Sequence, residues 1–134
     1  MRRSTILRWA AAVGWTGLVV ALTLLPGSSR VVHDASAWFG GTELTDAIGH
    51  FLLFLVLAVT WQGALASWLE RSRALLAAGG FAGALGAVVE IGQVFIPGRG
   101  SGMLDLAANW MGVAAALLLS AITDQVRRRH SAGE

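Results

Sequence analysis

Ionisable and amide side chains gather at the ends of the apolar runs in this sequence. An ionisable group inside an apolar helix costs at least ~2.5–3.5 kcal/mol at mid-membrane, so such groups persist where they have a partner or a function. The grouping therefore predicts a polar site held inside a bundle of apolar helices. In chain order the residues concerned are Asp46, His50, Glu90, Gln93, Arg99, Asp105 and Asn109.

Glu90 allows two compatible interpretations. In the first, Glu90 or Asp105 neutralises Arg99 and fastens the loop 97–103 to the helices. Breaking a partly buried pair of this kind at one partner costs ~3–5 kcal/mol. In the second, the Glu90 carboxylate handles a proton or binds a lipid head group.

His50 allows three interpretations. It is a hydrogen-bonded packing residue, an acid/base or proton-relay partner, or a metal ligand beside Glu90 and Asp105. The sequence has no H-E-x-x-H motif and no cysteine, and we expect neither a metal nor a cofactor. If the site is catalytic, the candidates are His50, Glu90 and Asp105.

Arg99 lies in the segment P-G-R-G-S-G, whose glycines permit a tight turn or the close approach of a ligand. It is either a turn residue whose side chain snorkels, or a guanidinium fork that binds phosphate or carboxylate. Asp105 and Asn109 are four residues apart and share a helix face. We expect the Asn109 amide to cross-link helices by hydrogen bonds worth ~0.6–2 kcal/mol.

The composition indicates a membrane protein. Of the 134 residues, 55% are hydrophobic and 13% are charged, against about 25% charged in soluble domains. Four apolar runs, roughly 7–25, 47–67, 74–96 and 104–123, each reach the ~20 residues that cross a bilayer. We predict an all-α fold, an integral membrane bundle of four transmembrane helices. The first run could be a signal peptide, but its length and the lack of an A-x-A site favour retention.

The placement of the arginines predicts the orientation. If the spans alternate, eight of the ten arginines fall on one side, and the other two are Arg30 and Arg99. The positive-inside rule then puts both termini in the cytoplasm and the polar residues near the outer surface. Because the arginines flank apolar runs, we expect no nucleic-acid partner.

Small residues recur at four- and three-residue spacings, which places each set on one narrow helix face. Close packing of small residues associates helices in lipid, so these stripes predict the faces turned to other helices. They are Ala10, Gly14, Gly17 and Ala21 in the first run and Gly79, Gly83 and Gly86 in the third.

Taken together, the motifs resemble the VanZ-like family. The matching residues are Pro26, Asp46 with His50, Glu90 with Gln93, Pro97 with Arg99, Ser101, and Asp105 with Asn109 and Gly112. The resemblance covers roughly 20–118 and implies one VanZ-like membrane domain (1–134) of the bacterial cell envelope. Some members lower susceptibility to lipid-tailed glycopeptides such as teicoplanin. Ala47 and Phe54 replace a usual lysine and a frequent aromatic hydroxyl, so roles of those groups do not carry over.

Three functions fit these residues. The leading hypothesis is a binding protein whose outward cluster holds the anionic head group of an envelope lipid or lipid-linked cell-wall precursor, and so modulates lipoglycopeptide susceptibility. The alternatives are an enzyme performing acid/base chemistry on a lipid head group and a small proton-coupled carrier. A carrier would need a homo-oligomer, because four spans enclose little lumen. The predicted ligand-binding residues are Asp46, His50, Glu90, Gln93, Arg99, Ser101, Asp105 and Asn109.

Reporter fusions test the orientation. We expect a reporter of cytoplasmic location to be active at Ser131, and a reporter of export to be active in the loop 28–41, because the arginine-rich side stays inside. An export reporter that is active at Ser131 would reverse the predicted arrangement.

Overall fold

The computed structural model describes residues 2–26, 28–30, 34, 37, 42–99 and 102–132, with side chains as far as residue 130. Its long helices are α1 (Arg3–Leu24), α3 (Glu43–Leu65), α4 (Arg71–Gln93) and α5 (Met103–Ala132). No strand occurs among the described residues. All four helices are long and apolar enough to cross a membrane. The predicted all-α class and the four helices of spanning length are thus confirmed.

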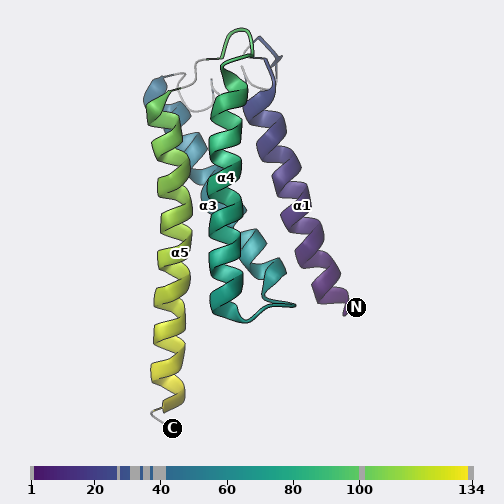
Figure 1. Ribbon diagram of the computed structural model, residues 1–134, viewed down its shortest axis with the longest axis vertical. Coiled ribbons are helices and arrows are strands. Elements are labelled where there is room, and N and C mark those ends of the chain that lie inside the picture. Colours follow the sequence, from purple (N-terminus) through teal and green to yellow (C-terminus); the bar gives the residue numbers. More distant parts are fainter. Residues whose placement is uncertain are drawn as a thin grey trace.

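The four helices run alternately up and down (Figure 1), so both chain ends lie toward the same end of the bundle. Central α3 packs against α1, α4 and α5, and α4 also contacts α5 and, less extensively, α1. We call the opposite end of the bundle the polar end. It is where Leu24, Glu43, Gln93 and Met103 lie.

The observed helix ends lie within four residues of the apolar runs, except that α5 continues nine residues beyond its run, to Ala132. Local hydrogen bonds set some of these ends. At the start of α3, the Thr45 backbone N–H donates to Thr42 Oγ1 at 3.3 Å and the Thr42 N–H donates to Thr45 Oγ1 at 2.9 Å. This reciprocal capping begins the helix ahead of the apolar run. Helix α4 ends at Gln93 and leads into a turn with Gly98 at φ 74°, which favours glycine.

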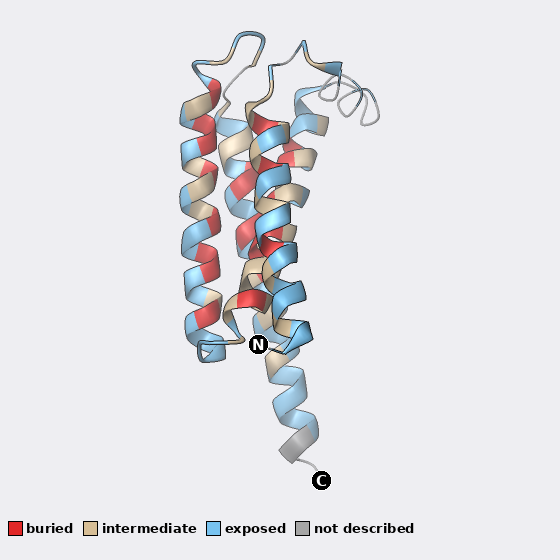
Figure 2. Cartoon of the chain, turned by 90° about the vertical axis from the view of Figure 1, so that its right-hand side faces the viewer, coloured by how far each residue is buried: buried red, intermediate tan, exposed pale blue. Residues whose placement is uncertain are grey.

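The apolar surface of the bundle is arranged as in a protein that faces lipid. Buried positions line the inner sides of the helices, and the outer sides are exposed (Figure 2). Large apolar side chains such as Leu76, Val88 and Leu118 are among the exposed ones. The buried core is Val19, Phe54, Leu57, Ala58, Ala82, Val113 and Ala116.

Among the described glycines, Gly112 of α5 lies closest to the backbone of another helix. A Cβ atom built there would overlap the backbone carbonyl oxygen of Phe51 and would lie 3.0 Å from the backbone N of Leu55. Backbone atoms cannot rotate away as side chains do. Glycine at this position therefore lets α3 and α5 touch, as small residues do in membrane bundles.

The prediction that the glycine stripes of the first and third runs face other helices is partly wrong. A Cβ at Gly79 would meet a side chain of α5, and one at Gly86 would meet side chains of α5 and α3, as expected. At Gly14, Gly17 and Gly83 nothing lies within 4 Å of such a Cβ, so these glycines do not face another helix of the chain closely.

On α1, larger side chains rather than the glycines are turned toward the core. Helix α1 instead turns Val19 and Trp15 inward, and the Trp15 indole Nε1 donates a hydrogen bond to the Leu53 carbonyl at 3.0 Å. Packing of these larger side chains sets the distance between α1 and α3. The glycine stripe of α1 is left on the outer side, where Gly14 and Gly17 are exposed.

A matched pair of glycine substitutions tests the α3–α5 contact. Gly112→Ala should lower the stability of the purified protein by roughly 1–3 kcal/mol, because the new methyl group forces two backbones apart. Gly83→Ala adds the same methyl group on α4 without a clash and should be neutral or slightly stabilising. Thermal melting in detergent measures both. Equal melting temperatures for Gly112→Ala and the wild type would contradict this contact.

Candidate functional site

Four polar side chains are buried together at the polar end. His50 lies in the second turn of α3, Glu90 and Gln93 lie in the last turn of α4, and Asn109 lies in the second turn of α5. Their exposed fractions are 7%, 7%, 1% and 0%. Burial of this kind is costly unless each group finds a hydrogen-bond partner, so the partners define the site.

A short chain of hydrogen bonds joins three helices. His50 Nδ1 lies 2.9 Å from Asn109 Oδ1, and Asn109 Nδ2 donates to Glu90 Oε1 at 3.2 Å. His50 Nδ1 is also 3.7 Å from Glu90 Oε1. Asn109 therefore bridges the histidine and the carboxylate, which is the helix cross-link expected of it.

The bridge assigns the histidine tautomer. An ionised carboxylate only accepts hydrogen bonds, so the Asn109 Nδ2 amide nitrogen must face Glu90. The Asn109 carbonyl oxygen then faces His50, and His50 Nδ1 must carry a hydrogen to donate to it. In the neutral ring, Nε2 is consequently the atom that accepts a proton or a hydrogen bond.

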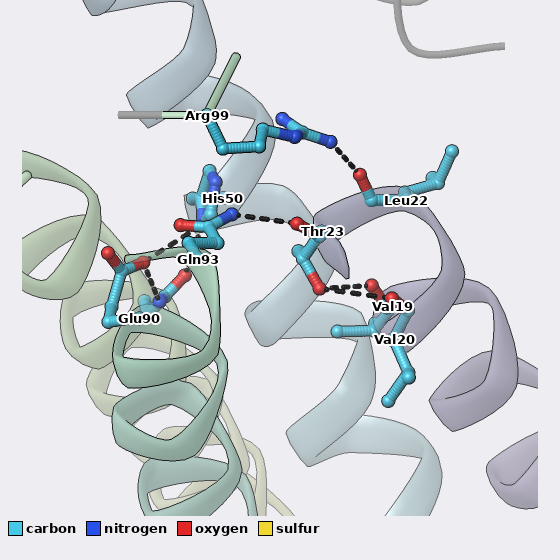
Figure 3. Close-up of polar contacts among 9 residues, drawn as sticks. Val19, Val20, Leu22, Thr23, His50, Glu90, Gln93 and Arg99 are labelled. Carbon is cyan, nitrogen blue, oxygen red and sulfur yellow. Dashed lines mark hydrogen bonds and ion pairs between the residues drawn. The ribbon is translucent and has the colours of Figure 1, made fainter. Parts of the chain in front are cut away.

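Gln93 and Thr23 connect this cluster to α1. Gln93 Nε2 donates to the Thr23 backbone carbonyl at 2.9 Å (Figure 3). The Thr23 hydroxyl donates to the Val19 carbonyl within α1 at 2.6 Å. The sequence interpretation missed Thr23, although a threonine near the C-terminal end of the first apolar run was a usable signal.

Arg99 binds the C-terminal end of α1. Its Nε donates to the Leu25 carbonyl at 3.0 Å, and its Nη2 donates to the Leu22 carbonyl (Figure 3). The last carbonyls of a helix lack partners within it, and a cation at that end is favourable. Because α1 has no basic residue in its own last turn, Arg99 supplies the cation from the α4–α5 loop.

Pro26 explains why the Leu22 carbonyl needs this partner. In a continuing helix, the backbone N–H of residue 26 would donate to the carbonyl of residue 22. Proline has no N–H, so Arg99 Nη2 takes its place. Pro26 and Arg99 were both recognised in the sequence, but the sequence did not show that the arginine replaces the hydrogen bond that the proline cannot make.

Acidic residues surround Arg99 at the polar end. Asp46 and Asp105 both interact with it electrostatically, and Asp105 also interacts with His50 and Glu43. Burial lowers the pKa of the Arg99 guanidinium and the two aspartates raise it. The group stays charged, because its ordinary pKa is far above neutral pH.

The structure brings together some of the predicted ligand-binding residues more closely than others. His50, Glu90 and Asn109 form one hydrogen-bonded unit, which Gln93 extends to α1. Asp105 is half-buried and Asp46 is exposed; both are linked to the site by electrostatic interaction. Arg99 is hydrogen-bonded to α1 carbonyls rather than ion-paired with Glu90 or Asp105. Ser101 lies outside the described residues.

Two oxygen atoms of the cluster are left over. Glu90 Oε2 and Gln93 Oε1 are buried and have no hydrogen-bond partner of normal geometry among the described residues; the Gly102 backbone N–H lies near the Glu90 carboxylate and interacts with it weakly. Buried polar atoms of this kind are rare in folded proteins and call for an explanation. Both are acceptors, so the missing partner has to be a donor. The described residues hold no group of three or more metal-ligating side chains.

Comparison with known proteins gives no relative. The sequence matches no protein-family model and no curated protein, and the fold matches no solved structure. The resemblance to the VanZ-like family stays a prediction from the motifs.

Substitutions at Arg99 test its bond to α1. Arg99→Ala should destabilise the protein by about 1.5–3 kcal/mol, because charged hydrogen bonds to the Leu22 and Leu25 carbonyls are lost. The stability of Arg99→Lys should lie between those of Arg99→Ala and the wild type, since an ammonium keeps the charge but lacks the planar fork. Thermal melting in detergent is the measurement, with Arg73→Ala, an exposed arginine at the other end, as the control. Arg99→Ala melting at the wild-type temperature would refute the bond.

Proposed function

We propose that this chain is a four-span protein of the bacterial cell membrane, of the VanZ-like kind, with both termini in the cytoplasm. The support is the pattern of its surface. Four helices of spanning length expose large apolar side chains, and arginines are concentrated toward the end of the bundle that carries the chain ends. With that orientation the polar end faces outward.

The polar end then binds the phosphate-bearing head group of an envelope lipid or lipid-linked cell-wall precursor. The observations that support this proposal are the N–H donors of Arg99 that its bonds to α1 leave unused and the convergence of four buried polar side chains at the same end, two of which keep an unpartnered oxygen. A membrane protein that needed only tight packing would have apolar groups there, because unpartnered polar atoms destabilise it. The phosphate belongs at Arg99, because the unpartnered oxygens would repel it.

Arg99 can serve such a ligand in spite of its bonds to α1. A guanidinium has five N–H donors, and the two hydrogen bonds to Leu25 and Leu22 use one on Nε and one on Nη2. Its remaining donors suit the phosphate of a head group. Binding of a precursor in this way would alter the access of lipoglycopeptides to the same precursor, and so the susceptibility of the cell.

An acid/base enzyme is the second candidate, favoured by the His50–Asn109–Glu90 chain. That chain holds His50 with Nε2 as the accepting atom, the arrangement a general base needs. A binding protein should tolerate His50→Gln, because glutamine can still donate to Asn109 Oδ1. An enzyme should lose its activity with that substitution.

Native mass spectrometry of the full chain, purified in mild detergent, tests head-group binding. We expect the wild type to retain a phosphate-bearing lipid and Arg99→Lys, which keeps the charge but loses the planar fork, to retain much less. Arg73→Lys, the same change at an exposed position at the other end of the bundle, should retain as much as the wild type. Equal retention by all three proteins, or none by the wild type, would reject the proposal.

A further inference from the structure

We infer that Glu90 Oε2 and Gln93 Oε1 receive a primary ammonium group of the bound head group, an inference that rests on the proposed head-group function. The two residues are three positions apart on α4, a spacing that places Cβ atoms ~5–6 Å apart on one helix face. A single small donor can therefore reach both side chains.

The chemistry of the two oxygens selects a donor with several N–H groups. The opposite atom of each side chain is already engaged, Glu90 Oε1 with Asn109 and Gln93 Nε2 with the Thr23 carbonyl. These bonds fix the orientation of both groups and leave an acceptor on each. An ammonium carries three N–H donors and no acceptor, so it can satisfy both oxygens at once, whereas a phosphate oxygen would be repelled by them.

The charge of the surroundings favours a cation. Glu90 lies within electrostatic range of Asp105, and Asp105 lies within range of Asp46 and Glu43. These four carboxyl groups lie near one guanidinium, Arg99, which interacts with Asp46 and Asp105. They also lie near the His50 ring, whose Nδ1 is 3.7 Å from Glu90 Oε1. Acidic groups thus outnumber basic ones even when His50 is charged. A positively charged group beside Glu90 compensates a buried carboxylate, and an uncompensated one is strongly destabilising.

The burial of the two oxygens limits the size of the occupant. Neither atom is reached by solvent in the structure. A primary ammonium is a compact point charge. A trimethylated ammonium has the same charge, but it is larger and has no N–H to donate. The site should consequently distinguish these two cations.

Binding of matched short-chain lipids to the full-length protein in mild detergent tests the inference. The probes are phosphatidylethanolamine, phosphatidylcholine and phosphatidylglycerol, with free ethanolamine as a fourth, and native mass spectrometry measures the bound fraction. We expect the wild type to prefer phosphatidylethanolamine over phosphatidylcholine by about tenfold or more, as one or two charge-assisted hydrogen bonds imply. Glu90→Gln and Gln93→Met should each abolish most of that preference, and Glu70→Gln, at an exposed position between α3 and α4, should retain it.

The outcomes separate this inference from the proposed function. Equal binding of the two ammonium lipids, or a preference for phosphatidylglycerol, would overturn the ammonium site while head-group binding stood. Absence of binding by all three lipids would reject both. Free ethanolamine that binds as tightly as the lipid would support the ammonium site and show a soluble amine to be its source. The wild-type comparison needs no variant, so a substitution that fails to fold leaves the test decisive.

Discussion

The arrangement of the polar end depends on the contact between the backbones of α3 and α5 at Gly112. Phe51, whose carbonyl lies against Gly112, directly follows His50, and Asn109 lies one turn before Gly112 on α5. A side chain at position 112 would separate the two helices, and the 2.9 Å contact between His50 and Asn109 could not form. Gly112, which has no side chain, thus determines how close His50 and Asn109 lie to each other.

The polar cluster combines satisfied and unsatisfied atoms in a way that ordinary packing does not require. Asn109 is bonded on both sides of its amide, whereas Glu90 and Gln93 are each bonded on one side only among the described residues. A half-satisfied buried network is less stable than an apolar one. The free energy lost in this way is recoverable when a ligand supplies the missing donors, and this is the sense in which the cluster resembles a binding site.

The sequence predicted much of this organisation, because it depends on the lengths and the order of the apolar runs. Apolar length identified the four helices, and alternation placed His50, Glu90 and Asn109 at one end. Contacts that depend on two distant segments could not be predicted in the same way. The partner of Arg99 is a set of backbone carbonyls on α1, which have no residue signature. The exposed glycines of α1 mislead for the same reason, because a stripe of small residues shows a face that can pack closely but does not show which helix lies opposite.

The capping of α1 by Arg99 also has a consequence for the order of synthesis. The Leu25 and Leu22 carbonyls precede their arginine partner by 74 and 77 residues, so α1 leaves the ribosome long before its end can be completed. Until α4 and the following loop emerge, water or lipid head groups must solvate those carbonyls. Helix α1 can pack against α3, which it contacts more extensively than α4, before Arg99 has been made, but a nascent chain that stops before residue 99 carries a first helix without this C-terminal cap.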